Sequence, residues 1–360
     1  MSLYGRKLRL TTFGESHCKA VGGILEGFPS DFTIDVGKIQ LQLDRRRAKG
    51  SISTQRQETD LLEILSGLEN SKTLGTPIGF MVKNKDIKPE DYKSSQGEGD
   101  NYIPRPSHAD YTYLSKYGIH ASSGGGRSSA RETISRVIGG AISEQYLLDN
   151  LGCEIVAWVS QIGTVKMNNT LDNITREMVD LSPVKCPDLS ISEKMVEEIT
   201  VAKSQNDSVG GIVECVVKNP PIGLGEPCFD KLEALLAHAM LSIPATKGFE
   251  IGQGFGVVNM RGSDHNDMFS KKGENGIQPS TNKAGGTLGG ISTGKDIYIR
   301  VAFKPPSTIA TPQDTVDISG NRVILEAKGR HDPSIVHRAI PIVESMVALT
   351  LLDCYLLNKS

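Results

Sequence analysis

Residues 124–133 (GGGRSSARET) constrain the fold of the 360-residue chain more than any other segment. Their three glycines can take positive φ angles and let the backbone approach a ligand closely. Ser129 and Glu132 have the S-x-x-E spacing of a capping box, and apolar residues then recur at helical spacing, so we predict a helix over 129–149. The start of such a helix favours an anion such as phosphate; an ordinary capped helix with a flexible lead-in is the alternative.

Short segments with strand or helix character alternate along the rest of the chain. Residues 297–303 alternate apolar and polar side chains, as in a half-buried strand. Asp332 and Pro333 are suited to start a short helix that Pro341 ends or kinks. Because these elements lack a regular βαβ rhythm, we expect an α+β fold of layered sheets and helices. Further strands are predicted at 21–27, 77–83, 153–160, 210–218 and 254–260, and further helices at 230–241 and 341–357.

A short peptide occurs twice in nearly the same form. VGGILE at 21–26 returns as VGGIVE at 209–214, each time where a strand is expected to start. The echo indicates two related halves that share one core, with chance similarity of six residues as the alternative. No low-complexity linker separates the halves, so residues 1–360 are expected to form a single domain.

The overall composition excludes several classes of protein. A net charge of −2 and an aromatic content of 5% argue against a nucleic-acid binder. The six cysteines show no C-x-x-C pair, and no Asp, Glu, His or Cys cluster has ligand spacing, so no metal is expected. We find no signal peptide and no apolar stretch near the ~20 residues of a membrane span. These features predict a cytoplasmic protein with reduced thiols and without a membrane or nucleic-acid partner.

Basic residues and histidines gather beside the glycine-marked segments. Residues 45–49 (RRRAK) contain three consecutive arginines, and Arg105 lies just before His108. Such a run is often only a solvated surface, but beside glycine loops in a near-neutral chain it favours a small polyanion. His17, His108 and His331 lie in glycine- or proline-marked loops and are candidates for proton transfer near neutral pH. The residues alone therefore predict an enzyme that binds a phosphorylated, carboxylated substrate and moves protons.

Taken in order, these segments resemble the chorismate synthase family. The similarity covers nearly the whole chain, and the combination of motifs is highly specific. The resemblance implies a β-α-β sandwich with internal pseudo-symmetry, which agrees with the repeated peptide, and a homotetramer. The matching motifs lie at 9–17 (RLTTFGESH), 44–47 (DRRR), 54–56 (TQR), 108–113 (HADYTY), 126–133 (GRSSARET), 223–227 (GLGEP), 261–263 (RGS), 284–286 (AGG), 289–292 (GGIS), 304–305 (KP) and 329–333 (GRHDP).

The resemblance also implies a reaction. Chorismate synthases are lyases that convert 5-enolpyruvylshikimate 3-phosphate to chorismate and phosphate by anti 1,4-elimination, the last step of the shikimate pathway. The substrate carries a phosphate and two carboxylates, which accounts for the many arginines. The family requires reduced FMN although the overall reaction is redox-neutral, because the departing ring proton is not acidic enough for an ordinary base.

Roles for individual residues follow from the same resemblance. His17 resembles the acid near the departing phosphate, with Ser16 as a relay beside it. His108 resembles the histidine that protonates the reduced flavin, and Asp332 the carboxylate that assists proton removal. The candidates for the substrate's anions are Arg46, Arg47, Arg105 and Arg131, of which Arg46 also matches a position linked to NADP. The residues that match the flavin site are Arg127, Ser128, Ser129, Pro244, Ala245, Gly289, Lys304, Pro305, Pro306, Ser307, Thr308 and Arg330.

The chain departs from the family pattern at a few positions. Cys18 and Ser107 stand beside His17 and His108 where glycine is common, which alters backbone freedom there. A basic residue often found near Ser51 is missing, and insertions typical of longer members are not seen. We therefore predict a monofunctional enzyme that takes reduced FMN from an external flavin reductase.

Functions of another class remain as alternatives. An inactive relative could bind flavin or a phosphorylated metabolite as a sensor, but a sensor would need only the anion-binding residues and not His17, His108 and Asp332. A nucleic-acid-binding role for the arginine run is weaker still, and it predicts a steep loss of DNA affinity with salt.

Overall fold

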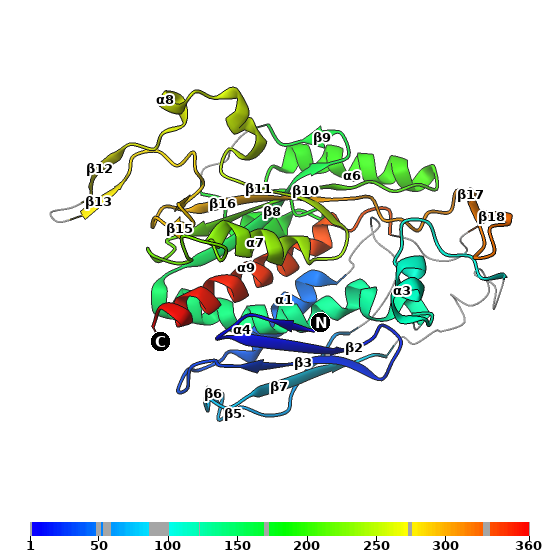
Figure 1. The fold of residues 1–360 in the computed structure, drawn as a ribbon, viewed down its shortest axis with the longest axis horizontal. Helices are drawn as coiled ribbons and strands as arrows, with labels where there is room; N and C mark the ends of the chain where they lie inside the picture. The colour runs from blue at the N-terminus through cyan, green and yellow to red at the C-terminus, as the bar shows by residue number, and fades with distance from the viewer. Residues whose placement is uncertain are drawn as a thin grey trace.

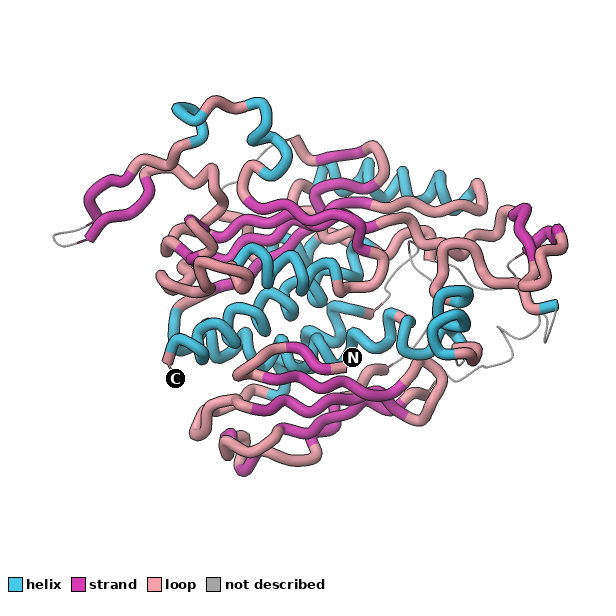
Figure 2. Tube along the Cα trace, in the orientation of Figure 1, coloured by secondary structure: helices cyan, strands magenta, loops and turns pink. Residues whose placement is uncertain are grey.

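The computed structural model describes residues 2–47, 52, 59–85, 101–121, 123–168, 173–272, 276–326 and 332–359. Two five-stranded antiparallel sheets enclose a layer of helices (Figures 1 and 2). The first sheet has the order β1 (Leu3–Tyr4), β2 (Arg9–Gly14), β3 (Ala20–Glu26), β7 (Ile78–Lys83) and β4 (Leu62–Ile64). The second has the order β11 (Thr246–Ile251), β16 (Ile297–Phe303), β10 (Gly211–Lys218), β8 (Glu154–Ile162) and β9 (Val165–Lys166).

The layer between the sheets consists of α1 (Val36–Arg46), α4 (Thr133–Leu151), α7 (Leu232–Leu241) and α9 (Val336–Asn358). Helices α5 (Arg176–Leu181) and α6 (Leu189–Ser204) lie against the second sheet from outside, and α3 (Asp110–Tyr117) lies at one end. Smaller elements are the hairpins β5–β6 (Leu68–Glu69, Lys72–Thr73), β12–β13 (Phe269–Lys272, Gly276–Pro279), β14–β15 (Thr287–Leu288, Ile291–Ser292) and β17–β18 (Gln313–Val316, Arg322–Leu325), helix α8 (Gly262–His265), and 3-10 turns at Ser123–Ser128, Ala130–Glu132 and Gly254–Asn259. The predicted α+β sandwich is confirmed.

The two halves of the fold share one connectivity. The first half runs β2, β3, α1, β4, β7, α4, and the second runs β8, β10, α7, β11, β16, α9. The elements inserted between these are the β5–β6 hairpin and α3 in the first half, and β9, α5, α6, the arm between β11 and β16 and the β17–β18 hairpin in the second. Core strands are ordered β2-β3-β7-β4 in one sheet and β8-β10-β16-β11 in the other. The repeated peptide at 21–26 lies in β3, and its counterpart at 209–214 leads into β10, the equivalent strand. The topology therefore supports the expected internal pseudo-symmetry.

Helices α4 and α9 form the centre of the core. The apolar residues of α4 that recur at helical spacing are buried, including Ile134, Val137 and Ile138. The two helices are in close contact at Gly140, where an added Cβ would lie 2.2 Å from the Cβ of Ser345. Glycine is required there because any side chain would have to push the helices apart.

Helix α9 is long and apolar enough to cross a membrane. It has 23 residues and a mean hydropathy of 1.7 over its most apolar 18-residue window, yet 89% of that window is buried inside the protein. The prediction that no apolar stretch approaches the length of a membrane span is therefore wrong for this helix. Burial between two sheets explains the composition, since a helix covered on all sides has no polar face.

The carboxylate of Asp353 anchors the turn between β1 and β2 to α9. It accepts hydrogen bonds from the backbone N–H groups of Arg6, Lys7 and Leu8 at 3.0, 2.8 and 2.8 Å. The N-terminal edge of the first sheet is therefore fastened to a helix from the far end of the chain.

Several predicted elements differ in detail. Residues 254–260 form a 3-10 turn instead of a strand. Helix α9 begins at Val336 after Ile335, so Asp332 and Pro333 do not cap it, and it continues past Pro341. Pro341 lies in the second turn, where its missing N–H costs one backbone hydrogen bond while the surrounding buried face holds the helix together.

Candidate active site

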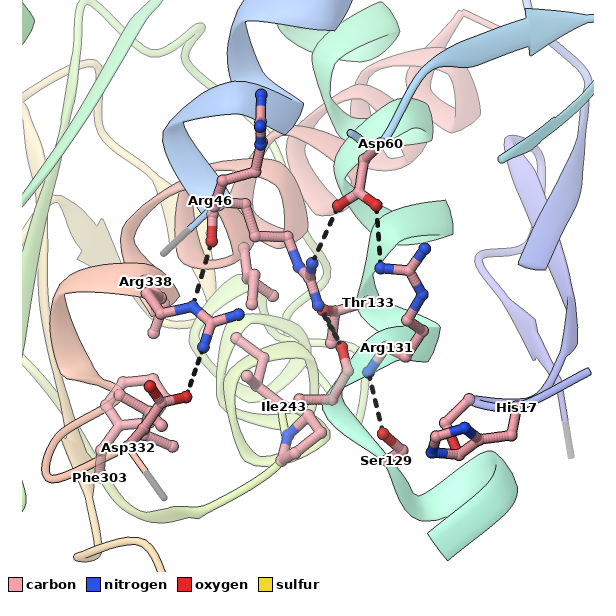
Figure 3. Close-up of a pocket in the computed structure, with 17 residues that line it drawn as sticks. His17, Arg46, Asp60, Ser129, Arg131, Thr133, Ile243, Phe303, Asp332 and Arg338 are labelled. Atoms are coloured by element: carbon pink, nitrogen blue, oxygen red, sulfur yellow. Dashed lines mark hydrogen bonds and ion pairs between the residues drawn. The ribbon is translucent and has the colours of Figure 1, made fainter. Parts of the chain in front are cut away.

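A pocket of about 200 Å³ opens where the C-terminal ends of α1 and α7 meet the starts of α4 and α9 (Figure 3). It is lined on one side by apolar side chains that include Ile243, Phe303 and Ile342. Cations and carboxylates from segments far apart in the sequence line the rest of the pocket, both beside the start of α4 and on the α9 side. Of the residues predicted for the site, the pocket gathers Ser16, His17, Arg46, Arg47, Ser129, Arg131, Pro244 and Asp332.

Arg45 and Arg46, at the end of α1, lie in two different environments. Asp35 caps the start of this helix by accepting from the N–H of Gly37 at 2.8 Å, and basic residues in its last turn complement the helix dipole. Arg45 is buried and pairs with Glu344 in the core, whereas Arg46 faces the pocket and is only 6% exposed. The surface alternative is therefore wrong for Arg45 and Arg46.

Contacts inside the pocket fix the side chain of Arg46. Its Nε donates to Oγ1 of Thr133 at 3.0 Å, and its Nη2 donates to the carbonyl oxygen of Ala130 at 2.7 Å. Both partners lie at the end of the glycine–arginine segment, Ala130 in a 3-10 turn and Thr133 at the start of α4. The predicted helix start therefore lies at the pocket, although its geometry differs from the prediction.

The glycine–arginine segment forms a short 3-10 turn before α4 begins. Ser129 caps a 3-10 turn by accepting from the N–H of Arg131 at 3.3 Å, and α4 begins only at Thr133. The carboxylate of Glu132 pairs with Arg136 at 2.8 Å instead of reaching back to Ser129, so the capping box is wrong. The ion pair one helical turn away competes successfully for the carboxylate.

Asp60 is a pocket residue that sequence reasoning missed. Its side chain is 2% exposed and lies between two arginines, with Oδ1 2.9 Å from Nη1 of Arg131 and Oδ2 3.6 Å from Nη1 of Arg46 (Figure 3). The carboxylate therefore holds both guanidinium groups on one side of the pocket. A single Asp outside any motif carries no sequence signal for such a role.

Asn84 links Arg131 to the loop that carries His17. Its Oδ1 accepts from Nε of Arg131 at 2.7 Å, and its Nδ2 donates to the carbonyl oxygens of Glu15 and Cys18 at 3.1 and 2.6 Å. Cys18 is not among the residues with positive φ, so this position does not require glycine. The substitution of glycine by cysteine is compatible with the loop geometry.

Asp332 and Arg338 lie on the α9 side of the pocket. Nη1 of Arg338 donates to Oδ2 of Asp332 at 2.6 Å, and its Nε donates to the carbonyl oxygen of Arg46 at 3.3 Å (Figure 3). Arg338 was also missed, because nothing in the sequence distinguishes it from other helix arginines. It fixes the orientation of the carboxylate and joins α9 to α1.

A second cluster surrounds His108. The ring nitrogens lie 3.0 Å from the carbonyl oxygen of Pro106 and 2.9 Å from Oγ1 of Thr308. Burial lowers the pKa of His108, and the nearby charges of Arg105 and Lys304 lower it further. Phe303, which lines the pocket, directly precedes the segment that carries Lys304 and Thr308, so this segment joins the two clusters.

The comparisons with known proteins agree with one another. The chorismate synthase family model matches residues 8–356. A chorismate synthase of Saccharomyces cerevisiae is 54% identical over 372 residues, covering 100% of this chain and 98% of the relative. Those of Schizosaccharomyces pombe and Prochlorococcus marinus are 50% and 51% identical, and the alignments cover 97% and 96% of these relatives and 100% and 98% of this chain. The chain belongs to the chorismate synthase family. A crystal structure of chorismate synthase matches 99% of this chain and 93% of its own with a TM-score of 0.77 at 29% identity.

Membership in the chorismate synthase family makes the protein an enzyme, a lyase acting in the shikimate pathway. The resemblance seen in the sequence motifs is confirmed. Among the described residues, no group of three or more His, Cys, Asp or Glu could hold a metal ion.

Other residues matched to the chorismate synthase flavin site have varied surroundings. The guanidinium of Arg127 donates to the carbonyl oxygen of Gly14 at 2.9 Å and to Oγ1 of Thr12 at 2.6 Å, and so supports the strand that leads to His17. Ser128 donates to the carbonyl oxygen of Gly125 at 2.5 Å.

Further candidate positions lie away from the pocket or outside the described residues. Arg105 forms a bidentate pair with Asp110 at 2.8 and 2.9 Å and does not line the pocket. Gly289 lies in the β14–β15 turn, beside Gly290, whose carbonyl accepts from the start of α7; the pocket lies at the opposite end of that helix. Arg330 and His331 lie outside the described residues. The roles of these positions stay predictions.

Proposed function

We propose that the enzyme converts 5-enolpyruvylshikimate 3-phosphate to chorismate and phosphate by anti 1,4-elimination and requires reduced FMN. The observation that supports this most directly is the composition of the pocket. Four arginines, two carboxylates and His17 surround a cavity with an apolar wall. A cyclic substrate with a phosphate and two carboxylates has matching chemistry.

The excess of cations explains how several anions could be bound together. Arg46, Arg47, Arg131 and Arg338 line the pocket, against the carboxylates of Asp60 and Asp332. Guanidinium groups suit phosphate and carboxylate because they offer paired N–H donors in one plane. Asp60 and Asn84 hold the Arg131 guanidinium in position before a ligand arrives, which lowers the entropic cost of binding.

The acid in this scheme is His17. As the C–O bond breaks, the phosphate leaves with the bonding electron pair, and a protonated His17 would donate a proton to it. Ser16 lines the same pocket and would act as a relay. Asn84 holds this loop against Arg131, so the acid and the anion-binding group are placed as one unit.

The carboxylate of Asp332 would assist removal of the ring proton. Arg338 donates to its Oδ2 and therefore keeps the carboxylate directed at the pocket from the α9 side. In Figure 3, Asp332 and His17 lie on opposite sides of the pocket. Such separation is appropriate for an anti elimination, in which the proton and the phosphate leave from opposite faces.

The residues present fit reduced FMN, a flat, partly apolar and anionic group. The apolar wall formed by Ile243, Pro244 and Phe303 would suit a flavin ring, and Lys304, which directly follows Phe303, would supply a cation. When bound, reduced FMN supplies electron density that makes the elimination possible. His108 would hold a proton near the flavin. Burial lowers the pKa of His108, and the negative charge of a bound anion would raise it again.

Several features of the proposal concern partners. We propose a cytoplasmic homotetramer that takes reduced FMN from an external flavin reductase and has no nucleic-acid or membrane partner. The burial of Arg46 and its bonds to Thr133 and Ala130 favour a role in substrate binding over contact with NADP. Turnover in air with oxidised FMN and NADPH alone would contradict the need for a reductase.

The decisive experiment is chorismate formation from the shikimate ester under anaerobic conditions, with and without reduced FMN. We expect turnover only with the reduced cofactor. Tight binding of flavin and substrate without any chorismate would instead support the sensor alternative.

A further inference from the structure

Two hydrogen bonds join the segment before α3 to the segment after β16. Oγ of Ser307 donates to the carbonyl oxygen of Ser107 at 3.2 Å, and Oγ1 of Thr308 lies 2.9 Å from Nε2 of His108. Lys304 donates to the hydroxyl of Ser307. Ser107 has a φ of 57°, in the left-handed region where glycine is favoured, so these bonds help to hold a strained backbone beside the histidine.

The contacts of His108 define which ring nitrogen carries the proton. Nδ1 lies 3.0 Å from the carbonyl oxygen of Pro106, which can only accept, so Nδ1 must be the donor. In the neutral ring Nε2 is then the acceptor, and the hydroxyl of Thr308 donates to it. Because burial lowers the pKa of His108, this neutral form predominates near pH 7.

Thr308 can keep this hydrogen bond when the ring becomes charged. Both nitrogens of a protonated imidazole are donors, and a threonine hydroxyl can rotate to accept instead of donate. The bond to the charged ring is the stronger of the two, because hydrogen bonds that involve an ion are about twice as strong as neutral ones. Thr308 therefore stabilises the protonated ring more than the neutral ring.

We propose that Thr308 is a positioning residue for His108, which holds Nε2 in both protonation states and favours proton uptake there. The proposal rests on the proposed role of His108 as a proton donor to the flavin. It differs from contact with the cofactor, because it acts through the histidine and exists in the protein without any ligand.

Among the residues that the structure describes, three charged groups act on the ring. Arg105 and Asp110 come from its own segment, and Lys304 comes from the opposite one. Arg105 and Asp110 pair with each other, so their effects on the ring partly cancel. None of these groups is altered by a change at Thr308, and a change in the pKa of His108 would therefore report the hydroxyl.

The test is an NMR titration of protein with ¹⁵N-labelled histidine, without flavin, in which the His108 signals are identified by their loss in His108→Asn. Thr308→Val should lower the pKa of His108 by roughly 0.5–1 unit, a 3- to 10-fold weaker proton affinity, because the charged hydrogen bond is lost. Thr308→Ser should keep the wild-type value. Thr308→Ala removes the same hydroxyl and replaces Thr308→Val in the titration if the valine variant does not fold.

Thr311→Val is a matched control three residues further on. The hydroxyl of Thr311 donates to the carbonyl oxygen of Asn206 at 3.1 Å, away from the ring, so this variant should leave the His108 titration unchanged. A wild-type pKa in both Thr308→Val and Thr308→Ala would overturn the proposal.

Kinetics then separate this proposal from the proposed function. The alkaline limb of the pH–rate profile, where a proton donor loses its proton, should move in Thr308→Val by the same amount as the NMR titration. If the titration moves and the kinetic limb does not, Thr308 still positions His108, but His108 is not the proton donor.

Discussion

Asp60 and Arg131 form an ion pair of 2.9 Å inside the pocket, and the Asp60 side chain is 2% exposed. The pair places a carboxylate next to a site that is proposed to bind three anionic groups. It therefore holds the guanidinium in position and also supplies counter-charge while no ligand is bound.

Removal of that charge should destabilise the protein. Asp60→Asn leaves Arg46 and Arg131 buried together, and the expected loss in the free energy of unfolding is at most about 3–5 kcal/mol. Inorganic phosphate should restore part of it by binding the folded state. Denaturation with and without phosphate measures both effects. Asp31→Asn, which breaks an exposed pair with Lys72, is the control and should change little.

Arg131 should contribute strongly to substrate binding. Arg131→Ala is expected to weaken it by about 2–5 kcal/mol, because the side chain is a buried partner of an anion. Arg131→Lys should recover only part of this, since an ammonium group cannot reproduce the paired donors. Substrate affinities of the two variants decide the question, and full affinity in the lysine variant would contradict a direct contact.

Alanine variants of His17 and His108 should lose catalytic rate for different reasons. His17→Ala and His108→Ala are each expected to lose about 10²–10⁴-fold in rate. Lower pH should partly relieve the His17 variant, because a protonated phosphate leaves without help. The His108 variant should instead shift the spectrum of bound reduced flavin toward the anionic form. Anaerobic pH–rate profiles and flavin spectra test this, and a flavin change in the His17 variant alone would reverse the assignment.

Because of His337, the free energy of unfolding should decrease as the pH falls below about 6.5. Burial lowers its pKa from 6.5 to about 4, so the unfolded chain takes up a proton that the folded protein excludes. The resulting loss of stability is absent at pH 7 and grows as the pH falls from 6.5 toward 4, reaching about 2 kcal/mol at pH 5. His337→Gln should show a weaker dependence in denaturation curves between pH 5 and 7. The exposed His120→Gln should behave like wild type.

Strands with one face packed against the helix layer were the most predictable elements. The strand predicted at 297–303 coincides with β16, because a strand in the middle of a sheet must alternate buried and outer residues. Ends of elements were less predictable. Helix α4 starts later than expected because Glu132 pairs with Arg136, a choice between two local partners that spacing alone does not decide.

The site was predictable where it follows motifs and unpredictable where it depends on the fold. His17, Arg131 and Asp332 lie in glycine-marked segments that the sequence reveals. Asp60 and Arg338 reach the pocket only because β-sheet and helix packing bring them there. Their partners are distant in the chain, so no local pattern reports them.

Helix α9 follows the other pocket-forming segments in the sequence, and this order matters while the protein is being synthesised. This helix contributes Arg338 and Ile342 to the pocket, and its Asp353 secures the first sheet. A ribosome produces it after every other element of the fold. The nascent chain therefore leaves the inner face of the second sheet and the facing side of α4 uncovered until this helix has been made, and the pocket is assembled only then.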